Sequence, residues 1–74
     1  MKEQPNVQSN QKQARAKLPY SVTIEDTSYH TFAYTEEAAL SNAAFRYAQE
    51  NNMGVGLVMF RIKKGEIYSN VEEV

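Results

Sequence analysis

Apolar and polar positions alternate regularly near the start of the folded part of the chain. Tyr20, Val22 and Ile24 alternate with polar residues, which is the period-two pattern of a strand with one buried face. Turn-forming residues follow at positions 26–28, and a second alternating stretch covers residues 29–34. The two stretches therefore predict a β-hairpin.

A helix is predicted directly after this hairpin. Thr35 is a good N-cap, because its hydroxyl can accept from an otherwise unpaired backbone N–H. Glu36 and Glu37 follow it, where negative charge is favoured by the helix dipole. Residues 51–52 and Gly54 are expected to end the helix. One face of the helix carries an apolar stripe, formed by Leu40, Ala43, Ala44, Tyr47 and Ala48.

The segment after the helix is predicted to be a second hairpin. Residues 54–62 are apolar at both odd and even positions, which is interpreted as a strand that is apolar on both faces. Residues 63–66 contain a glycine suited to a turn, and residues 67–71 alternate again. The predicted fold is α+β: a ββαββ chain, with a four-stranded antiparallel sheet in the order 2-1-3-4 and one helix on one face. Residues 1–17 are almost wholly polar and are interpreted as a disordered basic tail, which leaves residues 18–74 as a single small domain.

This arrangement predicts a surface for protein binding. One helix can cover only one face of the sheet, so the other face would carry Leu57 and Met59 towards solvent, with Tyr29 and Tyr68 beside them. Phe45 lies off the apolar stripe of the helix. Exposed apolar and aromatic groups with a charged rim are typical of protein interfaces. A homodimer that covers the same groups is an alternative that the sequence leaves open.

Composition limits the other classes of function. The 74 residues include no cysteine and one histidine, and His30 has no further residues at metal-ligand spacing. Ser28 and His30 share one side of a strand, but this spacing recurs by chance, and no catalytic constellation is recognised. We therefore expect a non-enzymatic protein without a cofactor. With no apolar run of about 18 residues and no signal-peptide pattern, a soluble cytoplasmic protein without membrane contact is expected.

Nucleic-acid binding is the alternative function. Residues 1–19 have four basic side chains and one acidic one, a net charge of +3, whereas residues 20–74 have four basic and eight acidic ones, a net charge of −4. The Gly54-Val55-Gly56 segment leaves a helix, the reverse of the order that aims a helix N-terminus at phosphate. The candidate nucleic-acid contacts are basic: Lys12, Arg15, Lys17, Arg61, Lys63 and Lys64.

The order of elements carries a resemblance to known families. Two strands, a Thr-capped helix beginning Thr35-Glu36-Glu37-Ala38-Ala39, a strand entered through glycine and a closing hairpin resemble small phage-encoded anti-CRISPR inhibitors. Residues 35–48 also resemble the helix of HicB-like antitoxins. The first resemblance implies a stoichiometric inhibitor or adaptor that blocks a nucleic-acid-processing complex in the host cytoplasm. Its acidic contacts with a basic groove would be Glu25, Asp26, Glu66, Glu72 and Glu73.

Overall fold

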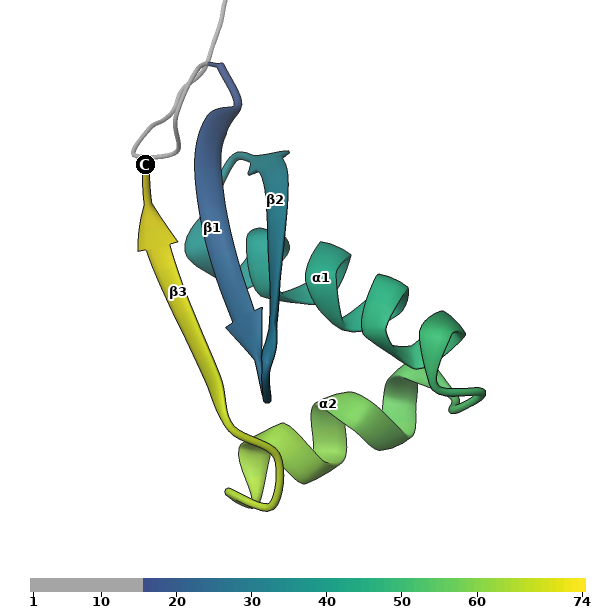
Figure 1. The fold of residues 1–74 in the computed structure, drawn as a ribbon. Coiled ribbons are helices and arrows are strands. Elements are labelled where there is room, and N and C mark those ends of the chain that lie inside the picture. Colours follow the sequence, from purple (N-terminus) through teal and green to yellow (C-terminus); the bar gives the residue numbers. More distant parts are fainter. Residues whose placement is uncertain (1–15) are drawn as a thin grey trace, which may run out of the picture.

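The computed structural model describes residues 16–74, and the predicted basic tail therefore lies almost wholly outside the described residues. In the described part, two strands, two helices and a third strand follow one another (Figure 1). The elements are β1 (Leu18–Ile24), β2 (Thr27–Ala33), α1 (Glu36–Glu50), α2 (Val55–Lys63) and β3 (Ser69–Glu73).

The predicted first hairpin is confirmed. β1 and β2 are antiparallel, with Val22 opposite Tyr29, and the turn lies at Glu25-Asp26, one residue before the predicted one. Glu25 has a φ of 54°, a left-handed conformation that a tight turn requires and that L-residues adopt at some cost. As expected from the alternation, one face of β1 is buried.

The predicted helix is confirmed, together with its cap. The Thr35 hydroxyl accepts a hydrogen bond of 3.1 Å from the backbone N–H of Ala38. At the other end, the Met53 N–H donates to the carbonyl of Ala48 at 2.8 Å, while Asn52 has a φ of 55°. This is a Schellman ending, in which a left-handed residue lets the chain reverse while the last carbonyls stay paired.

The predicted third strand is wrong, because residues 55–63 form helix α2. Gly54 does not lead into a strand: it is the N-cap of α2, and its carbonyl accepts from the N–H of Val58 at 3.1 Å. The apolar run also has helical spacing, since Val58 and Ile62 are four residues apart and fall on one side. A run that is apolar at nearly every position fits both periods, and here the capping residues at both ends decide for the helix.

The predicted turn at residues 63–66 is the end of α2 instead of a hairpin. Gly65 has a φ of 82°, so it adopts the predicted positive φ, but its N–H donates to the Ile62 carbonyl. The Glu66 N–H donates to the Arg61 carbonyl at 2.8 Å, which completes a second Schellman ending. The sequence signal for a left-handed glycine was therefore correct, while the element before it was misassigned.

The predicted four-stranded sheet with one helix is accordingly wrong. The fold is α+β with a three-stranded antiparallel sheet in the order β2-β1-β3 and two helices. β3 pairs with β1 in the register that places Val71 opposite Val22. The strand beside β1 is therefore residues 69–73, close to the predicted fourth strand at residues 67–71, and not the predicted third strand at residues 54–62.

The core lies between the sheet and α1 (Figure 1). Alanines make up most of the buried face of α1, which allows its backbone to approach the sheet closely. α2 packs on α1 and buries Val58 completely. The buried residues are Tyr20, Val22, Ile24, Tyr29, Ala33, Ala39, Ala43, Ala44, Ala48, Val58 and Ile67.

Candidate protein-binding surface

The outer side of α2 combines apolar groups with positive charge. Leu57 is 44% exposed and Phe60 is 57% exposed. At 100° per residue these two side chains and Lys64 fall within one arc, opposite the arc of Val58 and Ile62. α2 therefore buries one apolar side and presents a second one to solvent.

Basic side chains border these apolar groups. Lys64 Nζ lies 5.4 Å from the centre of the Phe60 ring, a distance at which the cation is attracted to the ring face. Arg61 and Lys63 are exposed on the two flanks of the same arc, and residues 55–63 contain no acidic residue. We call Leu57, Phe60, Arg61, Lys63 and Lys64 the α2 outer face.

The structure thus joins residues that the sequence assigned to two rival functions. Leu57 was predicted as a protein contact, and the three cations as nucleic-acid contacts. Phe60 was missed as a contact, because the strand interpretation placed it on the buried side with residues 58 and 62. Helical spacing was the signal that could have found it, since Leu57 and Phe60 are three residues apart.

Other predicted interface residues lie elsewhere. Tyr29 is only 2% exposed, so its predicted exposure on an outer sheet face is wrong: its strand position faces α1, on the same side as Val22. Met59 is half-buried and packs against the core, since a helix turns it towards α1 where a strand would have turned it outward. Phe45 and Tyr68 are exposed as predicted, on α1 and just before β3.

The buried phenol of Tyr29 is held by α1. Its hydroxyl donates to Glu50 Oε1 at 2.6 Å, and the Arg46 guanidinium lies 5.0 Å from the ring centre. Burial is the main cause that raises the pKa of Tyr29 to about 12, and the hydrogen bond to Glu50 and the negative charge of Glu50 add to it. This network fixes α1 against β2, and it accounts for Tyr29 as a structural residue.

The acidic residues predicted to contact a basic groove do not form one site. Glu25 is used within the fold, because its Oε2 accepts a hydrogen bond of 2.8 Å from the Tyr68 backbone N–H. Asp26 is exposed in the hairpin turn, and Glu66 is exposed after α2. Glu72 and Glu73 are exposed on β3.

The basic residues predicted to contact nucleic acid are also divided. Lys17 lies just before β1, with its Nζ 5.7 Å from the centre of the Tyr34 ring. Lys12 and Arg15 lie outside the described residues. Only the three cations at the end of α2 are brought together by the fold.

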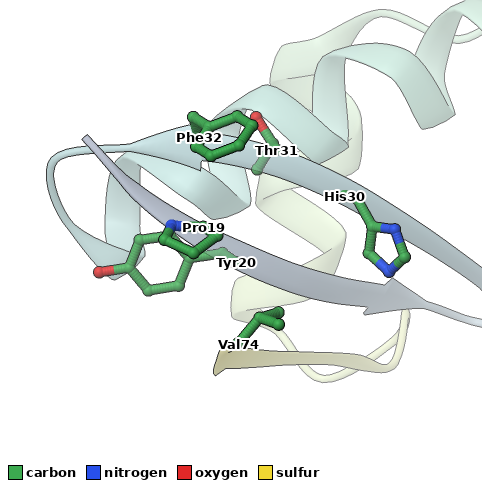
Figure 2. Close-up of a pocket in the computed structure, with 6 residues that line it drawn as sticks. All are labelled: Pro19, Tyr20, His30, Thr31, Phe32 and Val74. Carbon is green, nitrogen blue, oxygen red and sulfur yellow. The ribbon is translucent and has the colours of Figure 1, made fainter.

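The sheet face opposite α1 carries a small hollow (Figure 2). Its volume of about 160 Å³ is below the roughly 300–1,000 Å³ of typical small-molecule pockets. His30 lies there at the rim, and its backbone carbonyl accepts from Arg46 at 3.1 Å. The lining residues are Pro19, Tyr20, His30, Thr31, Phe32 and Val74.

Two further findings bear on chemistry. Among residues 16–74, no three His, Asp or Glu side chains are grouped so that they could hold a metal ion. Neither helix of this part of the chain has the length and apolar character that crossing a membrane requires. Three comparisons with known proteins gave no match to a family model, a curated protein or a solved structure.

Proposed function

We propose that this chain is a non-enzymatic binding protein that docks a protein partner on the α2 outer face. The observation that carries the proposal is a nine-residue helix with apolar side chains on opposite sides. Only the side with Val58 is used by the core. Exposed Leu57 and Phe60 side by side on one helix are typical of a helix that binds in an apolar groove.

The charges of the α2 outer face define the partner. Three cations surround the two apolar groups, with no carboxylate among residues 55–63. The complementary surface is an apolar groove bordered by Asp and Glu side chains. The aromatic ring would supply affinity in the centre of the interface, while the cations at the rim would set orientation and association rate. A stoichiometric inhibitor or adaptor of a nucleic-acid-processing complex is the form of this function that the anti-CRISPR resemblance implies.

The test compares variants in affinity capture from the cells that encode the chain, with bound proteins quantified by mass spectrometry. Leu57→Glu and Phe60→Glu should each reduce the captured partner by roughly tenfold or more, because a buried unpaired charge costs more than 1.4 kcal/mol. Phe32→Glu is the matched control: Phe32 is at least as exposed as Phe60, but it lies on the open sheet face. Equal capture by all three variants would refute the assignment.

Nucleic-acid binding is the second candidate, favoured by the position of Arg61, Lys63 and Lys64 beside Phe60. An aromatic ring among cations can stack a base while the cations contact phosphates. Three phosphate contacts predict that log K for single-stranded DNA falls with log salt with a slope of about −2. Binding with that slope, abolished by a Lys63→Glu/Lys64→Glu double variant, would establish this candidate, and absence of binding at low salt would exclude it.

A further inference from the structure

The two edges of the sheet differ in how they are protected. On β2, side chains of α1 bond the outward carbonyls: Asn42 Nδ2 donates to Phe32 O at 3.4 Å and Arg46 donates to His30 O at 3.1 Å. These bonds occupy acceptors that an added strand would need. The edge of β2 is therefore partly closed.

The edge of β3 is open. The Glu25 N–H donates to the Tyr68 carbonyl, and the Val74 N–H donates to the Pro19 carbonyl. The backbone N–H and C=O groups of the even-numbered residues in this segment therefore point towards β1. The backbone groups of Ser69, Val71 and Glu73 consequently point away from the sheet. Within residues 16–74, no side chain bonds these outward groups, and no element lies beside them (Figure 1).

We propose that this edge pairs with the β3 edge of a second copy of the chain, antiparallel and with the twofold axis at Val71. In that register Val71 lies opposite Val71 of the second copy. Ser69 lies opposite Glu73 and Asn70 lies opposite Glu72. The Val71 pair on the axis and the two Ser69–Glu73 pairs exchange both backbone hydrogen bonds, because these residues carry the outward groups. The Asn70–Glu72 pairs between them are non-hydrogen-bonded pairs.

Side chains select this register among those that the backbone allows. Shifting the axis to Glu72 or Glu73 would place identical carboxylates opposite each other, which destabilises a strand pair. Shifting it to Asn70 or Ser69 shortens the overlap. With the axis at Val71, no two carboxylates are opposite, and every residue of β3 is paired.

The same register covers two exposed apolar groups that the monomer leaves in solvent. Tyr68 is 60% exposed and Val74 is 76% exposed, and the register places each opposite the other in the second copy. Both lie on the open sheet face, where Val74 lines the hollow of Figure 2. On the opposite face, Val71 packs at the border of the core, so the pair of Val71 side chains extends the apolar layer across the axis. Contacts that repeat in this reciprocal way define a twofold interface.

Sedimentation and light scattering of the full chain over a concentration series test the proposal. We expect a doubling of mass with rising concentration and loss of the doubled species in Val71→Pro. That substitution removes an outward N–H and leaves the donors to β1 in place. A mass that stays that of one chain up to millimolar concentration would refute the proposal. So would a dimer that persists in folded Val71→Pro.

Disulfide trapping provides a second test that does not depend on the folding of the proline variant. The chain has no cysteine, so Val71→Cys has one partner only, at the twofold axis and at a distance of about 5.5 Å between Cα atoms. Asn70→Cys is the matched control, since the two copies of residue 70 are displaced by about 7 Å along the strands. Rapid oxidation of Val71→Cys to a dimer, with at least tenfold slower oxidation of Asn70→Cys, is expected. Equal rates, or faster Asn70→Cys, would contradict this register.

Discussion

Truncation of Phe60 and of Val58 tests whether residues 55–63 form a helix or a strand. Val58 is fully buried, whereas Phe60 is 57% exposed. Val58→Ala removes two buried methyl groups, at about 0.8 kcal/mol each, and leaves a small cavity. After the better helix propensity of alanine is counted, a loss of about 2 kcal/mol in the free energy of unfolding is expected.

Phe60→Ala should cost less, in spite of the larger side chain. Less than half of Phe60 is removed from water, and its cation–π contact with Lys64 is worth about 0.5 kcal/mol at an exposed site. Alanine also has a higher helix propensity than phenylalanine, which offsets part of the loss. A loss of about 1 kcal/mol is therefore expected. In a strand, residues 58 and 60 would share the buried face, and Phe60→Ala would cost about 3–5 kcal/mol.

Urea unfolding followed by circular dichroism measures both values, with the wild-type chain as reference. The helix predicts that Val58→Ala lowers the unfolding midpoint more than Phe60→Ala does. If Phe60→Ala proves the more destabilising of the two, the assignment of the α2 outer face is wrong.

Three further predictions concern the ends and the packing of the helices. Thr35→Ala should lower the free energy of unfolding by about 1 kcal/mol through loss of the bond to the Ala38 N–H, whereas Thr35→Ser should retain most of it; equal losses would refute the cap. Gly65→Ala should cost about 1–2 kcal/mol, because its φ of 82° is strained for a residue with a Cβ; an unchanged urea midpoint would contradict this conformation. The pKa of Tyr29 is about 12 in the folded chain, above the ordinary value of 10. The stabilisation from this phenol is therefore complete below about pH 10 and is lost as the pH rises towards 12. Unfolding free energies between these pH values should fall more steeply for the wild type than for Tyr29→Phe, and parallel curves would show that this phenol does not contribute.

The first hairpin and α1 were predicted correctly, because the spacing of apolar residues and the capping residue there fit one type of element only. Strict alternation at Tyr20, Val22 and Ile24 allows no helix with a buried face, and Thr35 supplies a specific side chain at a specific N–H. Both features act over a few residues, so local reasoning was sufficient.

The part that was predicted incorrectly lacks such a period. Residues 55–60 are apolar or glycine at every position, so neither a strand nor a helix pattern is excluded, and β-branched valines favour a strand locally. The helix is decided by packing of Val58 on α1 and by the cap at Gly54. The misassigned strand also made the site prediction incomplete. Leu57 and the three cations were predicted as contacts, but a strand does not place them beside Phe60.

We propose above that the α2 outer face binds a protein partner. The most direct measurement places a photo-crosslinking amino acid at position 60 and, as control, at position 32, irradiates each in the cells that encode the chain, and identifies the crosslinked products. We expect one protein partner to be crosslinked from position 60 and at most weak crosslinking from position 32. A protein crosslinked from position 32 but not from position 60, or no protein product from position 60, would contradict this proposal.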